Sequence, residues 1–170
     1  MDEVSVVKVN SQEVMDDFIH VVDDIYRDYP QYVPDFEKDV RGVFDRQTNP
    51  GMEFSDIQPF VAYRQDVAVG RIVGIINRKA NKKWNIRNVR FSMIEFIDDQ
   101  AVSSALIEAV AEWGKAHGME RIHGPLGVTD FDKEGMLVED FDLRGSMTAI
   151  FNPPYYPRHM EALGFTKEVD

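Results

Sequence analysis

The chain has 170 residues, 44% of them hydrophobic, which predicts a single domain with a substantial core. Its lack of cysteine excludes disulfides, thiolate catalysis and cysteine metal sites, and a formal net charge of −11 disfavours nucleic acid as the main partner. No apolar run approaches the roughly 20 residues of a membrane span, and the first residues lack a signal-peptide pattern. We therefore expect a cytoplasmic protein without a membrane partner.

The first elements predicted along the chain are a strand over residues 4–9 and a helix from Ser11 to about Arg27. Ser11 is a typical N-cap, and apolar residues follow it at helical spacing. The next segment, 28–59, is rich in turn residues and is expected to be irregular, with a short helix over 36–44. Long irregular segments are often functional, so this one is a candidate wall for a binding site.

Two strands are predicted next, over 59–63 and 67–77, and the short connection between them indicates a hairpin. Gly70 and Gly74 lie inside the second strand, where glycine indicates a bulge or a close approach of another backbone. The following run, 78–90, contains six basic residues and no acid. Such a run is usually a solvated loop.

The clearest unit is a strand over 89–97 that leads directly into a helix ending at Gly118. The strand is β-branched and aromatic with few polar positions, which predicts a central place in the sheet. Asp98 or Asp99 is the expected N-cap of the helix, and Gly118 supplies the left-handed residue that ends it. A short strand over 121–123 follows.

The last part of the chain predicts an aromatic loop, a short helix ended by Gly164, and the start of another strand at Phe165. Only five residues follow Phe165, so that strand would be poorly paired. We therefore expect the natural fold to continue beyond Asp170, or a partner chain to complete the sheet. The element order predicts a mixed α/β domain of three layers.

Two segments carry a resemblance to a known family: Gln100-Ala-Val-Ser-Ser-Ala105 at the start of the long helix, and Leu163-Gly-Phe165 at the exit of the last one. Together with the element order they resemble the GNAT superfamily of acyl-CoA-dependent N-acyltransferases. The resemblance implies one domain over 1–170, with a mostly antiparallel central sheet and helices on both faces. It also implies acetyl-CoA or another acyl-CoA as cofactor, and an amine on a small molecule or peptide as acceptor. The missing last strands imply the N-terminal part of a longer protein or a homodimer.

The resemblance also implies a cofactor site at the joint between strand and helix. In the family, a Gln/Arg-x-x-Gly-x-Gly/Ala turn binds the CoA pyrophosphate through backbone N–H groups at a helix N-terminus. Gln100 and Ala105 match this pattern, Ser103 replaces its first glycine, and Asp98 and Asp99 are expected to repel the anion. The implied cofactor-binding residues are Phe96, Ile97, Gln100, Val102, Ser103, Ser104, Ala105 and Asn152.

Glu95 on the central strand is the candidate general base, because the attacking amine must lose a proton. A backbone N–H near Phe96 is the expected donor to the carbonyl oxygen as it gains charge. The alternative interpretation of Glu95 is a solvent-facing residue or an ion pair with Arg71 or Arg90.

The family's usual acid is a tyrosine four residues before the glycine of Gly-Phe, and Met160 occupies that position here. Methionine cannot transfer a proton. Tyr155 and Tyr156 lie about one turn earlier, and Tyr156 is the candidate acid.

Three functional interpretations follow from these residues. The first is an acyltransferase of GNAT type. The second is a GNAT-like module without catalytic activity that acts in recognition or oligomerisation within a larger protein, since both motifs depart from the family pattern. The third is binding of RNA or a membrane surface through residues 78–90. The spacing of the four histidines indicates no metal site.

Overall fold

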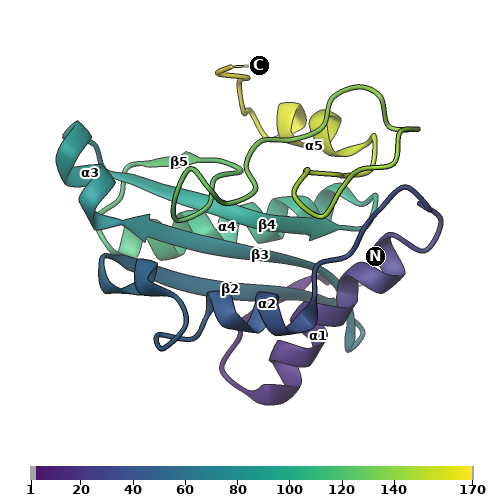
Figure 1. Cartoon of the computed structure of the whole chain (residues 1–170), viewed down its shortest axis with the longest axis horizontal. Helices are drawn as coiled ribbons and strands as arrows, with labels where there is room; N and C mark the ends of the chain where they lie inside the picture. The colour runs from purple at the N-terminus through teal and green to yellow at the C-terminus, as the bar shows by residue number, and fades with distance from the viewer. Residues whose placement is uncertain (1–2, 170) are drawn as a thin grey trace.

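The computed structural model describes residues 3–169, which form a five-stranded sheet between helical layers (Figure 1). The strands lie in the order β1-β2-β3-β4-β5, and neighbours pair antiparallel except for the parallel pair β4 and β5. This confirms the mixed, mostly antiparallel sheet that the sequence and the resemblance predict. The bounds are β1 Ser5–Lys8, β2 Ser55–Arg64, β3 Val67–Asn77, β4 Asn88–Phe96 and β5 Arg121–His123.

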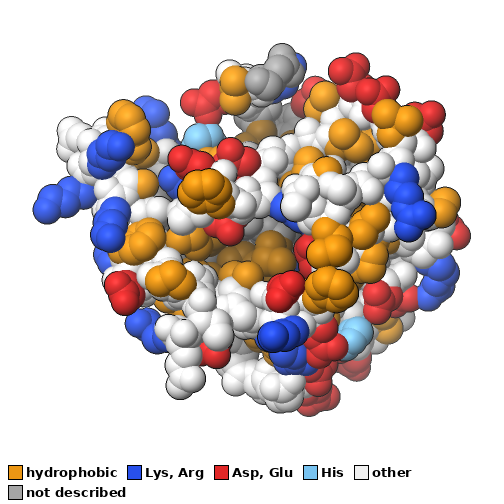
Figure 2. All heavy atoms as spheres, viewed as in Figure 1, with side chains coloured by type: hydrophobic (Ala, Val, Ile, Leu, Met, Phe, Trp, Pro, Cys, Tyr) orange, Lys and Arg blue, Asp and Glu red, His pale blue; other side chains and the backbone are white. Residues whose placement is uncertain are grey.

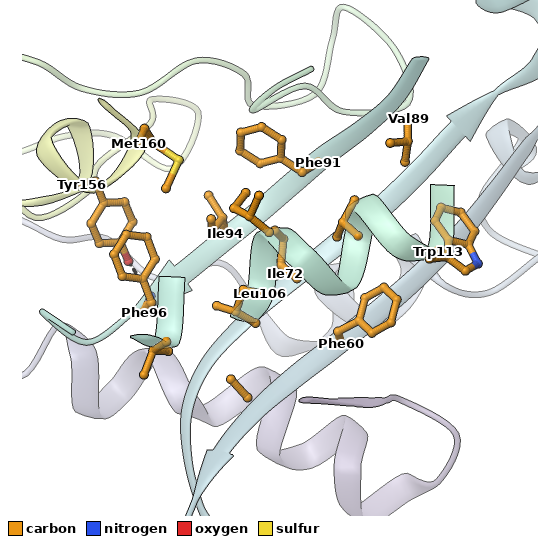
Figure 3. Packing of buried hydrophobic residues seen from close by; sticks show 14 of the residues in the cluster. Phe60, Ile72, Val89, Phe91, Ile94, Phe96, Leu106, Trp113, Tyr156 and Met160 are labelled. Atoms are coloured by element: carbon orange, nitrogen blue, oxygen red, sulfur yellow. Dashed lines mark hydrogen bonds between the residues drawn. The ribbon is translucent and has the colours of Figure 1, made fainter. Parts of the chain in front are cut away.

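Helices cover both faces of the sheet, as expected. In Figure 1, α4 (Gln100–Ala116) lies behind the strands, whereas α1 (Gln12–Ile25) and α2 (Glu37–Val43) lie in front. The core beneath α4 includes aromatic and aliphatic residues of β2, β3 and β4, together with two residues of α5 (Tyr156–Ala162) (Figure 3). A second core packs α1 and α2 against the front face. Within residues 3–169 no helix is both long and apolar enough to cross a membrane.

The hairpin of β2 and β3 explains the two glycines that the sequence singled out. A methyl group on Gly74 would lie 2.8 Å from the Trp113 ring, and one on Gly70 would lie 2.8 Å from the Glu95 carbonyl oxygen. Both glycines therefore permit close approach, as predicted. The strands also shift register after Ala62, which confirms a bulge in this hairpin.

Two expectations about local structure are wrong. The basic run begins with a helix, α3 (Arg78–Trp84), and not with a loop: Asn77 accepts a hydrogen bond from the Ala80 N–H at 2.9 Å, and lysine favours helix. Within the described residues no strand begins at Phe165. This ring packs edge-on against Phe91 at 5.5 Å between centroids, and the few residues after it have no strand partner.

Candidate active site

Glu95 faces the front of the sheet because β4 contains a bulge. Arg71 pairs with Glu95 and Val73 pairs with Ser92, so β4 contains one residue more than β3 between these two pairs. Within this interval Met93 has a φ of 47°. The extra residue reverses the alternation of side chains. Before the bulge the odd-numbered residues of β4 join the core beneath α4, whereas after it Ile94 and Phe96 do. Glu95 is thereby turned to the opposite face.

The Glu95 carboxylate is held by two tyrosine hydroxyls and approached by one cation. Tyr26 donates a hydrogen bond to Oε2 at 2.5 Å and Tyr156 donates to the same oxygen at 2.8 Å. The Arg71 Nη2 atom lies 4.0 Å from Oε1, and the Glu95 side chain is only 13% exposed. The alternative pairing with Arg90 is not present, since that guanidinium donates to the Gly127 carbonyl.

The environment of Glu95 favours its neutral form more than water does. Burial raises the pKa of its carboxyl above the usual value, and the charge of Arg71 and the two hydroxyls offset this only in part. Burial and the charge of Glu95 raise the pKa of Tyr26 and Tyr156 well above the usual tyrosine value. The site thus combines a carboxylate of increased basicity with two phenols that keep their protons.

Glu95 lies on the floor of a cavity of about 880 Å³ in front of β3 and β4, the hollow at the centre of Figure 2. Its walls come from the irregular segment before β2 and from the long loop between β5 and α5. Lys133 of that loop bonds to Asp35 on the opposite wall at 2.7 Å. The lining is largely apolar and includes Val33, Val43, Phe54, Val73, Ile75, Met93, Val128, Met136, Met147, Ile150 and Phe151.

At the start of α4, the first backbone donors bind the helix's own cap. Asp99 is the N-cap: its carboxylate accepts from the Ala101 N–H at 2.8 Å, and its carbonyl accepts from Val102 and Ser103. Val102 and Ser103 are fully buried. The side chain of Gln100 turns inward and donates to the Ser103 hydroxyl at 3.1 Å.

The α5 helix covers this joint. The Ser103 hydroxyl lies 2.9 Å from Nδ1 of the buried His159, whose Nε2 lies 2.7 Å from Asp98. Asp98 also pairs with Arg158 at 2.8 Å, and Asp99 pairs with Arg64 at 2.7 Å. The hydrogen bonds from His159 and Arg64 hold the pKa of Asp98 and Asp99, respectively, below the usual range. Both aspartates are therefore charged, and cations face each of them.

The edge of β4 is covered by the two tyrosines that open α5. The Phe96 N–H, expected to be free for a carbonyl oxygen, donates to the Tyr156 hydroxyl at 2.9 Å, and the Tyr155 hydroxyl donates to the Phe96 carbonyl at 2.6 Å. The rings of Phe96 and Tyr156 stack at 4.1 Å (Figure 3). The Ile97 N–H donates to Val69. In this arrangement the Phe96 N–H is bonded to the Tyr156 hydroxyl and does not face a substrate carbonyl oxygen.

Asn152, implied as a cofactor ligand, makes bonds within the loop instead. Its side-chain oxygen accepts from the Leu137 N–H at 2.7 Å, and its amide nitrogen donates to the Leu137 and Pro153 carbonyls at 3.1 Å. The residue is buried. Asn152 therefore organises the loop that forms one wall of the cavity.

No family model matches the chain. Two curated proteins do: Protein YghO of Escherichia coli, 31% identical over 153 residues, and the Bacterial ceramide synthase of Caulobacter vibrioides, 26% identical over 169 residues. The matches cover 90% and 99% of this chain but only 39% and 44% of those proteins. The chain thus spans about two fifths of the length of these relatives.

Solved structures that resemble the chain include acetyltransferases and a tandem GNAT protein. A tandem GNAT protein from the clavulanic acid biosynthesis pathway matches with a TM-score of 0.61 and 13% identity, over 95% of this chain and 43% of that one. The chain has the GNAT fold. The aminoglycoside N-acetyltransferase AAC(6')-Iy matches with a TM-score of 0.54 and 14% identity, over 97% of this chain and 92% of that one. A Trypanosoma brucei acetyltransferase matches at 0.53 and 12%, over 99% and 96%.

Within this GNAT fold, Tyr26 is the residue of the site that the sequence did not indicate. It follows α1 as its C-cap, and 69 positions separate it from Glu95. Its helical spacing with Val22 marks it only as a core residue. The sequence indicates Arg71 only as an alternative ion-pair partner of Glu95, and the structure places it, buried, beside that carboxylate.

Proposed function

We propose that the chain carries the amine-activating site of an N-acyltransferase, with Glu95 as general base. The observation that supports this most directly is a buried carboxyl with a raised pKa on the floor of a large cavity, bonded to a protonated tyrosine. Carboxyls whose pKa is shifted by burial in a cavity are characteristic of acid–base sites. The GNAT fold supports the same reaction class.

The proposed chemistry needs two proton transfers, and adjacent groups are available for both. Bound acyl-CoA would supply an activated carbonyl carbon and a thiolate leaving group. Glu95 takes a proton from the amine as nitrogen bonds to that carbon, and Tyr156 gives its proton to the departing sulfur as the carbon–sulfur bond breaks. Glu95 then returns a proton to Tyr156 across the 2.8 Å hydrogen bond. The products are an amide and a thiol, and both residues recover their starting state.

Two cations next to the start of α4, one on β2 and one on α5, would fit an anionic cofactor. Arg64 and Arg158 face the joint and would hold phosphate groups by charge-assisted hydrogen bonds. For this they would exchange Asp99 and Asp98, their present partners, for the phosphates. We propose that Gln100, Ser104 and Ala105 line this site with the two arginines.

The apolar cavity favours an acceptor amine attached to a long hydrocarbon chain. Glu95 lies on the cavity floor, and the walls contain many aliphatic and aromatic side chains that a hydrocarbon chain would cover and a small polar amine would leave unmatched. Charged side chains also line the walls, among them Asp35, Asp39, Asp132 and Lys133. The match to a protein named bacterial ceramide synthase supports the same class, because ceramide is a long-chain amino alcohol acylated on nitrogen.

The closed α4 start favours a second candidate, a binding module without transferase activity. Asp99 caps the first N–H groups and His159 contacts Ser103, so the joint is complete without a cofactor. Such a module would use the cavity to hold an apolar ligand.

Calorimetry and a thiol-release assay distinguish the two candidates. We expect CoA to bind and to protect residues 100–105 from amide exchange, and acyl-CoA plus a long-chain amine to release free thiol. Glu95→Gln should lower this rate by about 10²- to 10⁴-fold without loss of fold, whereas Glu112→Gln, an exposed carboxylate on α4, should not. If CoA produced no heat of binding and no protection from amide exchange, acyl transfer would be contradicted. The binding module without transferase activity would then be the supported candidate.

A further inference from the structure

The α3 helix forms a projecting tip at the end of the β3–β4 hairpin, at the left in Figure 1. Two asparagines anchor it to the body of the protein. The Asn77 amide donates to the Val128 carbonyl at 2.8 Å, and the Asn81 amide donates to the Asn88 carbonyl at 2.9 Å. The inner side of the tip is therefore fixed, and its other side faces outward.

The outward side presents three lysines. Lys79, Lys82 and Lys83 are spaced three and four residues apart, which places them on one face of the helix, and all three are exposed. Among residues 3–169 none of the three forms an ion pair, whereas Arg78 pairs with Asp56 and Arg87 with Glu120. Positive charge is therefore concentrated here, on a chain whose net charge is −11.

An exposed aromatic ring stands beside these lysines, and a second exposed apolar side chain, Ile86, follows it in the chain. Trp84 is 65% exposed and Ile86 is 37% exposed, and the Lys83 ammonium lies 4.9 Å from the centre of the Trp84 ring. Tryptophan beside lysine is the composition of a membrane–water interface, where the ring enters the headgroup layer and the ammonium groups pair with phosphates. Ile86 fits hydrocarbon and has no stacking surface for a nucleic acid base.

The tip also adjoins the cavity. Lys79 lies 4.3 Å above the centre of the Phe54 ring, and Phe54 lines the cavity wall. Figure 2 shows the basic side chains at the α3 end of the same face that carries the hollow. An apolar ligand leaving a lipid surface at α3 would thus start beside the cavity.

We propose that α3 docks this protein on the surface of an anionic membrane, with Lys82 and Lys83 on lipid phosphates and Trp84 and Ile86 among the headgroups. The inference goes beyond the proposed acyl transfer and does not depend on it. It develops the third interpretation of the sequence, binding of a membrane surface through residues 78–90. The expectation of no membrane partner rests on the absence of a membrane-spanning segment, and a surface contact needs no such segment.

Vesicle sedimentation tests the charged part of the proposal. We expect the chain to sediment with vesicles of phosphatidylcholine mixed with phosphatidylglycerol, to remain in solution with phosphatidylcholine alone, and to dissociate at high salt. The double change Lys82→Gln and Lys83→Gln should lower the partition coefficient by about 25-fold, since each lysine near an anionic surface contributes about fivefold. The matched control, Lys38→Gln with Lys115→Gln, removes the same charge elsewhere and should bind like the unmodified chain.

The apolar part has its own test. Trp84→Ala should weaken vesicle binding severalfold, whereas Phe36→Ala, which removes another exposed ring (62% exposed), should not. Equal sedimentation with neutral and anionic vesicles would overturn the proposal, as would equal losses in the test and control variants. Binding of RNA oligonucleotides with no vesicle binding would replace it by nucleic-acid recognition. Circular dichroism of each variant shows that the fold is retained.

Discussion

At the scale of single residues, four elements contribute one group each to the candidate site. Tyr26 follows α1, Arg71 lies on β3, Glu95 on β4 and Tyr156 on α5. Each alone has an ordinary structural explanation: a core tyrosine, a buried cation, a strand acid. Together they surround one carboxyl group, and burial and hydrogen bonds determine its basicity.

Tyr26→Phe should move the pH dependence of acyl transfer. The proposed base acts in its ionised form, so kcat/KM should rise with pH as Glu95 loses its proton. The Tyr26 hydroxyl lowers the pKa of Glu95 by bonding to the carboxylate, and its removal raises that pKa. The rising limb should therefore move to higher pH, and the free energy of unfolding should fall by about 1 kcal/mol for the lost hydrogen bond.

Tyr32→Phe is the matched control for this prediction. Tyr32 stacks on Tyr26 with ring centroids 3.7 Å apart, and within residues 3–169 its hydroxyl makes no hydrogen bond. The Tyr32→Phe variant keeps the ring stacked on Tyr26, and the rise of kcat/KM with pH should occur at the same pH as in the unmodified chain. Identical profiles for Tyr26→Phe and the unmodified chain would show that the short hydrogen bond to Glu95 does not tune the base.

At the scale of elements, the bulge in β4 and the close packing of α4 on β3 fix the site. The bulge turns Glu95 away from α4 and toward the cavity. The α4 helix approaches β3 closely because Gly70 and Gly74 carry no side chain there. The packing thus fixes the position of α4 on β3, and the backbone geometry of β4 positions the Glu95 carboxylate.

Gly74→Ala should destabilise this contact. The added methyl group would lie 2.8 Å from the Trp113 ring, which is buried against the strand and must shift. We expect the free energy of unfolding in urea to fall by about 1 to 3 kcal/mol. Gly145→Ala, where a methyl group meets nothing within 4 Å, should change it by less than about 0.5 kcal/mol. Equal stability of both variants would contradict the packing described.

At the scale of the whole molecule, the sheet separates two environments. One face is a continuous core under α4, and on the other face α1 and α2 pack in a second core beside the cavity that the long loop lines. The loop between β5 and α5 is attached at several points: Arg90 bonds to Gly127, Asn77 to Val128, and Lys133 to Asp35. The last of these bonds joins the two cavity walls directly.

Lys133→Ala should loosen this wall without unfolding the domain. The ion pair is partly exposed, so we expect a loss of stability below about 1 kcal/mol. Amide exchange in the loop, measured by mass spectrometry, should increase, whereas exchange in β3 and α4 should not change. Lys115→Ala removes an exposed lysine on α4 and should leave the loop unchanged. Unaltered exchange in the Lys133 variant would show that the other attachments suffice.

Local patterns in the sequence were sufficient for the elements that depend on neighbouring residues. Ser11 and Gly118 bound their helices as expected, because capping uses side chains and dihedral angles within one turn. The glycines of β3 indicated close approach because glycine inside a strand has no side chain to keep another element away, although the sequence did not say which element approaches. The element order predicted a mixed α/β domain of three layers, and the resemblance to the GNAT fold also needed the two short motifs at Gln100 and Gly164.

Tertiary structure decided the site. The sequence indicated Glu95 and Tyr156 separately, whereas the β4 bulge, the position of Tyr26 and the closure of the Gln100 joint by Asp99 and His159 all depend on contacts between segments far apart in the chain. The lysines of α3 were visible as a run, but only the folded tip shows which face they share. Local propensities act over a few residues, whereas hydrogen bonding, burial and pKa depend on every group that packs nearby.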